Sequence, residues 1–328
     1  YATLPYLAHK YRFAYLPSLA SLASIRLYRK PAVRYERELV SFADPVFEKN
    51  GYAENTRTAL TTLTRAVAPG KRLEIPRLPE TADEAREIAA ILAGKAGTAG
   101  RSEVYLRERA QEHAAKTLDL KTTRYLHFAT HGLLGGEFVA VRDALATSEL
   151  AGEDSQRNLK VQAATASAAA AAESAESDEP APRPYVDRGQ PALLLSLSGD
   201  MQGEDGLLTM GEVIESLDLN ARLVVLSACN TAGENRAASS GEGFAGLTRA
   251  FMYAGAQGIL VSHWSVESRA TQLLMSELFR NLSRDEQEDS LAALERARAA
   301  IRSSRDAAQD GLSRAHPYFW APFVYVGD

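Results

Sequence analysis

Two residues with complementary chemistry, Cys229 and His131, each follow a strand-like stretch of the sequence. Residues 125–130 read as a buried strand that ends at His131, where Gly132 allows a sharp turn. The apolar run 223–228 likewise stops just before Cys229. Because the carboxyl ends of parallel strands form the edge of a sheet where ligands bind, we expect the thiol and the imidazole to meet there.

A thiol beside an imidazole can act as a nucleophile. A free thiol has a pKa of about 8.5 and is mostly protonated at neutral pH, but an adjacent imidazole can take the proton and later deliver it to a leaving amine. Cys229 is the single cysteine of the chain, which excludes an internal disulfide and a multi-cysteine metal site. A lone cysteine is often a small buried hydrophobe, so a structural thiol stays open as an alternative.

The remaining histidines are weaker candidates for the base. His127 lies four residues before His131 in one expected strand, about 13 Å away, so the two cannot chelate one ion and His127 is interpreted as structural. His263, beside Trp264, is a candidate to line a substrate groove or to hydrogen-bond locally. The sequence has no phosphate-binding Gly-Lys-Ser/Thr loop and no Gly-x-Ser-x-Gly elbow, which argues against nucleotide binding and serine hydrolase chemistry.

Strand-like and helical patterns alternate along the chain, which predicts an α/β fold with a mostly parallel sheet covered by helices. Several of the expected strands are continuous apolar runs, as in strands that are buried on both faces. The predicted strands cover residues 12–16, 39–42, 104–107, 124–130, 193–197, 222–228, 258–264 and 323–326.

Helices are predicted from capping signals and apolar spacing. Thr81-Ala82-Asp83-Glu84 reads as a capping box, so a helix is expected to begin near Thr81. Apolar spacing predicts three more helices around residues 244–251, 274–282 and 291–301.

The segment 135–190 breaks this alternation. It contains an Ala/Ser/Glu-rich tract and a Pro-rich exit, and its tract offers few large apolar residues to pack on a core. We interpret it as a flexible insertion in a single domain that covers residues 1–328. Since it lies between the two strands that precede His131 and Cys229, it is also a candidate lid.

Composition excludes several classes of partner. The chain has 328 residues, 45% of them hydrophobic, which is enough for a substantial core. A formal net charge of −5 gives no electrostatic reason to bind nucleic acid or an anionic membrane. No apolar run approaches the roughly 18 residues that span a bilayer, and the N-terminus lacks a signal-peptide layout, so we expect a cytoplasmic protein. Because it begins at Tyr1 without a Met, we expect it to be part of a longer chain.

Four motifs resemble the CHAT domains, which are bacterial and eukaryotic relatives of caspases and separases that are often attached to tetratricopeptide repeats. The motifs are Tyr-Leu-His-Phe-Ala-Thr-His-Gly at 125–132, Leu-Ser-Ala-Cys-Asn-Thr at 226–231, the glycine-rich and aromatic stretch 243–256, and His-Pro-Tyr-Phe-Trp-Ala-Pro-Phe at 316–323. Weaker similarities, among them Ala-Asp-Pro-Val-Phe at 43–47, extend the resemblance over essentially the whole chain.

The resemblance implies a caspase-like three-layer sandwich with His131 and Cys229 as the catalytic pair of a cysteine endopeptidase, which works through an acyl-thioester intermediate. By analogy, the backbone N–H groups of Gly132 and Cys229 would form the oxyanion hole. Neither a cofactor nor a metal ion is implied. Candidates for lining a substrate groove are His263, Trp264, Ser265, Glu267 and Asp205.

The resemblance also implies a protein or peptide substrate and a regulatory partner, such as an adjoining sensor or tetratricopeptide repeat domain. A competing interpretation keeps the caspase-like fold as a scaffold or protein-interaction domain, whose dyad is latent until a neighbouring domain binds. The two interpretations differ in the reactivity of the thiol, because a catalytic cysteine titrates below the ordinary thiol value.

Overall fold

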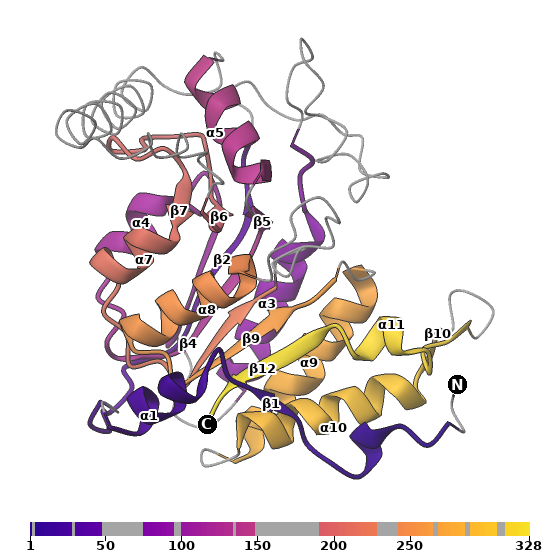
Figure 1. Ribbon diagram of the computed structural model, residues 1–328. Coiled ribbons are helices and arrows are strands. Elements are labelled where there is room, and N and C mark those ends of the chain that lie inside the picture. Colours follow the sequence, from indigo (N-terminus) through magenta and orange to yellow (C-terminus); the bar gives the residue numbers. More distant parts are fainter. Residues whose placement is uncertain are drawn as a thin grey trace, which may run out of the picture.

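The computed structural model describes residues 1, 4–27, 30–47, 75–94, 100–133, 136–147, 190–227, 242–264, 268–285, 289–306 and 312–328. Within these residues, a seven-stranded sheet lies between two layers of helices (Figure 1). This arrangement confirms the predicted α/β sandwich. The strands of this sheet, in spatial order, are β1 (Ala14–Tyr15), β12 (Phe323–Gly327), β9 (Gly258–Ser262), β8 (Leu223–Leu226), β4 (Thr123–Ala129), β2 (Arg37–Pro45) and β3 (Ser102–Arg107).

The sheet is mostly parallel, as predicted. Strands β3, β2, β4, β8 and β9 pair in parallel, whereas β12 runs antiparallel to β9 and β1 pairs in parallel with β12. The carboxyl ends of the five parallel strands therefore meet at one edge of the sheet. This edge is where the expected functional residues follow β4 and β8.

Alternate side chains of each central strand enter two separate cores. In β8, Val224 and Leu226 pack toward one face, and Leu223 and Val225 toward the other. Figure 1 shows α7 and α8 on the first face and α3, α9 and α10 on the second. The helices of the first face are α4 (Glu112–Thr117), α7 (Met210–Ser216) and α8 (Glu242–Ala254). Those of the second are α3 (Glu80–Ala93), α9 (Ser268–Arg284), α10 (Ser290–Ser303) and α11 (Pro317–Trp320).

The remaining elements are short. A 3₁₀ helix (Leu7–His9) and α1 (Leu19–Leu27) belong to the N-terminal part, and β10 (Arg305–Asp306) pairs with β11 (Leu312–Ser313). Among the described residues, no helix is both long enough and apolar enough to cross a bilayer.

A second, three-stranded antiparallel sheet extends the edge beyond β4, and of its three strands the sequence predicted one, at residues 193–197. It consists of β5 (His131–Leu133), β6 (Ala192–Leu194) and β7 (Leu207–Thr209). The expectation of a sharp turn at Gly132 is wrong, because Gly132 lies within β5 and pairs with Leu193. The change of sheet occurs two residues earlier, at Thr130, whose hydroxyl donates to the carbonyl of Leu194.

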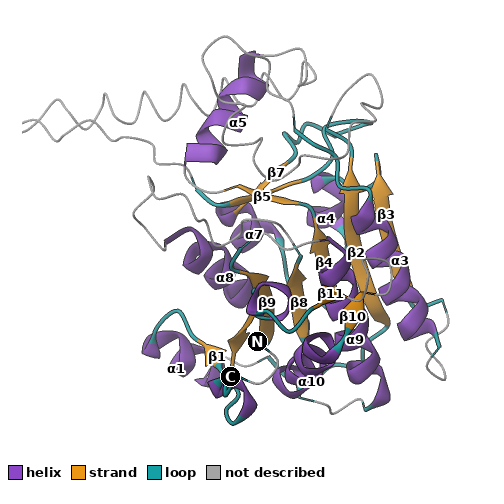
Figure 2. Cartoon of the chain, turned by 90° about the vertical axis from the view of Figure 1, so that its right-hand side faces the viewer, coloured by secondary structure: helices purple, strands orange, loops and turns teal. Residues whose placement is uncertain are grey.

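Part of the expected insertion is a packed helix. Residues Gly136–Thr147 form α5, which lies beside the small sheet beyond the ends of the central strands (Figure 2). The side chains of Phe138, Val141 and Leu145 are buried in a cluster with Leu133 and the small sheet. The expectation of a loop is therefore wrong for these residues, because three apolar side chains at helical spacing suffice to dock them. Residues 148–189 lie outside the described part of the chain.

The predicted capping box at Thr81 is also wrong. Helix α3 begins at Glu80 after Pro79, with no side-chain cap, because Thr81 and Glu84 have tertiary partners instead. Thr81 accepts the backbone N–H of Asp44, and Glu84 contacts His127. The chain does contain a capping box of the same Thr-x-x-Glu pattern, at Thr209 and Glu212, where it starts α7.

The packing of α5 can be tested with Phe138→Ala. Phe138 is 5% exposed, and removing a buried phenyl ring should lower the free energy of unfolding by about 3 kcal/mol. Chemical denaturation measures this value, with Asp143→Ala, at an exposed position of the same helix, as the control. Equal stability of the two variants would show that α5 does not pack on the domain.

Candidate active site

The ring of His131 is fixed by a backbone carbonyl from a distant part of the chain. His131 begins β5, directly beyond the end of β4, and its Nε2 lies 2.7 Å from the carbonyl oxygen of Pro76. A carbonyl oxygen can only accept a hydrogen bond, so Nε2 carries the proton. In the neutral ring, Nδ1 is then the unprotonated nitrogen, which is the form that a general base requires.

Burial keeps this ring neutral. His131 is 3% exposed, and its ring lies 5.3 Å from the ring of Phe47. Burial lowers the pKa of His131 below its ordinary value of 6.5, whereas the hydrogen bond to Pro76 opposes this shift. At neutral pH the imidazole is therefore in its neutral form, which is the form that can accept a proton.

Cys229 lies outside the described residues, as do its neighbours Ala228 and Asn230. The strand that leads to it is well defined. Strand β8 pairs with β4, and beyond its end the N–H of Ser227 donates to the carbonyl of Phe128 over 2.8 Å. The two strands thus run side by side up to two residues before the cysteine.

His127 is part of a buried hydrogen-bond network. Its Nδ1 lies 2.9 Å from the hydroxyl of Ser41 on β2, and its Nε2 lies 3.0 Å from the carboxylate of Glu84 on α3. Both ring nitrogens therefore have partners inside the protein, and the ring is fully buried. This agrees with the interpretation of His127 as structural.

Trp264 lines a small cleft at the carboxyl edge of the sheet. The cleft also contains Ser227 after β8, Ser262 at the end of β9, and Leu78 and Thr81 at the start of α3. The indole N–H of Trp264 lies 3.4 Å from the carbonyl of Tyr318, which orients the ring. The cleft adjoins the end of β8 and therefore the chain that continues to the cysteine.

The other candidates for the substrate groove have different surroundings. His263 is half-buried, with a pKa lowered by burial, and its ring lies 6.2 Å from that of Tyr15. Asp205 accepts the N–H of Leu207 at the start of β7. Neither His263 nor Asp205 lines the cleft of Trp264. Ser265 and Glu267 lie outside the described residues.

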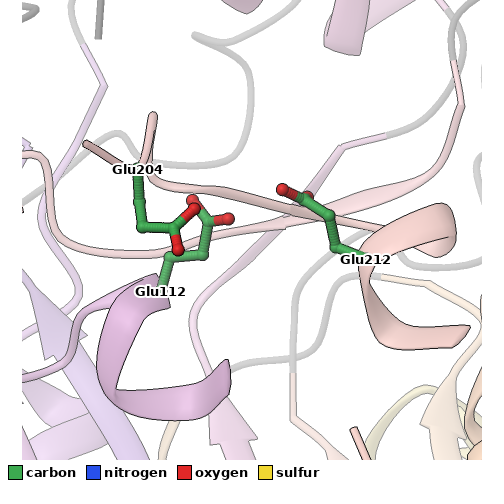
Figure 3. A group of neighbouring side chains, drawn as sticks. All are labelled: Glu112, Glu204 and Glu212. Atoms are coloured by element: carbon green, nitrogen blue, oxygen red, sulfur yellow. The ribbon is translucent and has the colours of Figure 1, made fainter. Parts of the chain in front are cut away.

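A group of three carboxylates, Glu112, Glu204 and Glu212, has the spacing of a metal site (Figure 3). Its centre already contains a cation, because the ammonium group of Lys116 lies 3.1, 2.6 and 3.1 Å from their oxygens, respectively. Burial, together with the neighbouring carboxylates of Glu212 and Asp205, raises the pKa of Glu112 to about 10. We interpret this group as a structural cluster that joins α4, α7 and the segment before β7.

The contacts of His131 include two residues that sequence reasoning did not assign to the site. Pro76 is 55 residues from His131, and no local pattern marks its carbonyl as a partner. Phe47 belongs to the Ala-Asp-Pro-Val-Phe segment of the family resemblance, which was the one available signal.

Comparison with known proteins agrees with the family resemblance. A family model described as the CHAT domain matches residues 2–328. The chain is also 33% identical over 121 residues to tetratricopeptide repeat protein 28 of human, and 32% identical over 121 residues to the mouse protein of that name. Each match covers 37% of this chain and 4% of the relative, so the similarity concerns a small part of those long proteins.

The protonation of His131 can be followed by NMR in the Cys229→Ala variant, in which no thiol titrates beside it. We expect a pKa below 6.5, with the proton of the neutral ring on Nε2. The unfolded chain binds this proton more readily than the folded chain does. The neutral ring therefore makes its full contribution to the free energy of unfolding above pH 6.5, and this contribution is lost as the pH falls through the folded-state pKa. A pKa above 6.5 would contradict this assignment, and His131→Gln, which lacks the titration, is the control.

The charge of Glu112 can be tested with Glu112→Gln. A carboxyl with a pKa of about 10 is protonated at pH 7, so the amide keeps the charge state and its carbonyl still accepts the N–H of Gly206, whereas its NH2 group replaces the oxygen that faces Lys116. We therefore expect a pH-independent difference in melting temperature at low pH, and a shift in favour of the variant as the pH rises from 5 to 9, because the wild type loses stability above pH 4.5. Glu215→Gln, at an exposed position of α7, is the control. A difference in melting temperature that stays constant between pH 5 and pH 9 would contradict the raised pKa of Glu112.

Proposed function

The chain belongs to the CHAT domain family, and from this membership and the geometry of His131 we propose that it is a cysteine endopeptidase. In this proposal Cys229 is the nucleophile and His131 is the general base. A cytoplasmic location and a protein or peptide substrate are parts of the same proposal.

The observation that carries the proposal is the hydrogen bond between Nε2 of His131 and the carbonyl of Pro76. This bond fixes the tautomer, and burial keeps the ring neutral at physiological pH. A histidine that served only the core would have partners for both nitrogens, as His127 has in Ser41 and Glu84. For His131 the described residues show one hydrogen bond, at Nε2, and the other nitrogen, Nδ1, is the one that the proposed chemistry uses.

The register of the central strands supports the pairing of His131 with Cys229. Each residue of β8 lies 98 residues after its partner in β4 along the chain. Examples are the pair Tyr125 and Leu223 and the pair Phe128 and Leu226. Cys229 is likewise 98 residues after His131, so both lie three residues beyond the last registered pair. Strands β4 and β8 lie about 4.8 Å apart up to Phe128 and Leu226, and His131 follows in β5, so the meeting of the thiol and the imidazole beyond these strand ends is part of the proposal.

The proposed reaction uses these groups in sequence. Nδ1 of His131 takes the thiol proton of Cys229, and the thiolate attacks the carbonyl carbon of the scissile peptide. Backbone N–H groups of Gly132 and Cys229 stabilise the oxyanion as it develops. The imidazolium then protonates the leaving amine, and water, activated by the same ring, hydrolyses the thioester.

A second candidate function, a latent scaffold, is favoured by the burial of His131. With an exposure of 3%, the ring is poorly accessible to a substrate in the described conformation. In this alternative a neighbouring domain must bind before the dyad is used, or the domain serves only as an interaction module.

We propose that an adjoining repeat domain regulates the site. The relatives in human and mouse are tetratricopeptide repeat proteins by name. Residues 1–33 carry most of the exposed large apolar side chains of the described residues, and in this proposal the repeat domain covers them. These side chains are Tyr1, Leu4, Leu7, Tyr11, Phe13, Tyr15, Leu27 and Val33.

The assignment of the dyad is tested by alkylation with iodoacetamide, which reports on the only thiol of the chain. In the wild type we expect the rate to titrate with a pKa well below about 8.5, the value of a free thiol. In His131→Ala the rate at pH 7 should fall at least about tenfold, because the proton acceptor is lost. His113→Ala, on α4, is the control.

Peptidase activity provides the second measurement. Cys229→Ala should abolish cleavage of a casein or peptide-library substrate and leave the melting temperature nearly unchanged. Full activity of this variant would disprove the nucleophile, and an inert thiol in the wild type would favour the latent scaffold.

A further inference from the structure

A buried ion pair lies next to the carbonyl that holds His131. Asp44, near the end of β2, is 1% exposed, and its two carboxylate oxygens accept hydrogen bonds of 2.7 and 2.6 Å from the guanidinium of Arg77. A second guanidinium, that of Arg107, lies 3.8 Å from the same carboxylate. Two parallel hydrogen bonds fix the orientation of the arginine as well as its distance.

The backbone around Asp44 is constrained too. Asp44 has a φ of 47°, in the left-handed region that few non-glycine residues adopt. Its N–H donates to the hydroxyl of Thr81 over 2.9 Å, and this hydroxyl donates to the carbonyl of Leu78 over 2.7 Å. The end of β2 therefore holds the segment from Ile75 to Pro79 at two points.

The position of Arg77 restricts the position of the Pro76 carbonyl. The carbonyl of Pro76 belongs to the planar peptide unit that also contains the nitrogen of Arg77, so fixing Arg77 restricts the direction of this carbonyl. The same carbonyl accepts the Nε2 proton of His131. A continuous path of contacts thus joins Asp44, Arg77, Pro76 and His131.

We propose that Asp44 and Arg77 are positioning residues for His131, which hold the Pro76 carbonyl and so keep the proton of the neutral ring on Nε2. The consequence for catalysis depends on the proposed peptidase function, whereas the consequence for the tautomer does not. A purely structural ion pair would change stability without changing the tautomer.

The chain offers a matched control pair on the same strand. Glu38, near the beginning of β2, is 2% exposed and lies 3.3 Å from Arg101 and 3.6 Å from Arg124. Arg101 and Arg77 have side chains of similar exposure, 31% and 33%. The ion pair of Glu38 and Arg101 lies at the opposite end of β2 from the candidate site. Neutralising Glu38 therefore tests the effect of removing a buried charge from this strand.

The experiment compares Asp44→Asn with Glu38→Gln by ¹⁵N NMR of the histidine rings in a Cys229→Ala background. The ring of His131 is assigned by the loss of its signals in His131→Ala. For Asp44→Asn we expect a mixture of Nε2–H and Nδ1–H tautomers and at least about tenfold faster exchange of the Nε2 proton with water. Glu38→Gln should lower the melting temperature to a similar extent while the tautomer stays on Nε2.

Arg77→Lys provides a second variant, because lysine keeps the charge but loses the bidentate geometry. It should show the same change of tautomer in a smaller fraction of molecules, and it decides the question if Asp44→Asn does not fold. Retention of the Nε2–H tautomer with slow exchange in the folded variants would overturn the proposal. So would an equal change of tautomer in Glu38→Gln.

Activity is measured separately, in chains that retain Cys229. In Asp44→Asn and Arg77→Lys we expect kcat to fall by about 10- to 100-fold with a smaller change in KM, as for a displaced catalytic group. If the wild type cleaves no substrate, the proposed function fails, and the NMR result still decides whether Asp44 and Arg77 position the ring.

Discussion

The central strands are buried on both faces, and this constraint concentrates the chemistry of the domain at one edge. A strand in such a sheet must place apolar side chains on both sides, so reactive polar groups are favoured where the strand ends. Strands β4 and β8 follow this rule, since their buried runs lead to His131 and toward Cys229. A polar side chain inside the sheet is that of His127, whose ring nitrogens both have hydrogen-bond partners, as a buried polar group requires.

Sequence reasoning was most successful for features that repeat over many residues. All eight predicted strands and the helices at 244–251, 274–282 and 291–301 are present, because a buried strand or an amphipathic helix leaves a periodic signal. The strands β5 and β7 have three residues each, which is too short for such a signal. Helix α5 was missed because the composition of the longer segment around it dominated the interpretation.

The capping boxes show why a local motif does not determine a local structure. Thr81 and Glu84 have the same pattern as Thr209 and Glu212, yet only the second pair caps a helix. The first pair instead binds Asp44 and His127, partners that fold to it from other strands. The Pro76 carbonyl was unpredictable for the same reason. Every residue has a carbonyl, and only the tertiary fold selects the one that meets His131.

The apolar cluster that contacts His131 through Phe47 is assembled from distant parts of the chain. Phe47 and Ile75 meet side chains of β5, α5, β6 and β7 there, so no single segment can form it. Proteins open locally in cooperative units, with free energies that range from near zero up to that of global unfolding. An opening free energy of about 1.4 kcal/mol would leave roughly one molecule in ten with a hydrated His131 ring and no fixed tautomer. The fraction of molecules in which His131 keeps a fixed tautomer would thus be set by an equilibrium of local order, to which residues far from this ring in the sequence contribute.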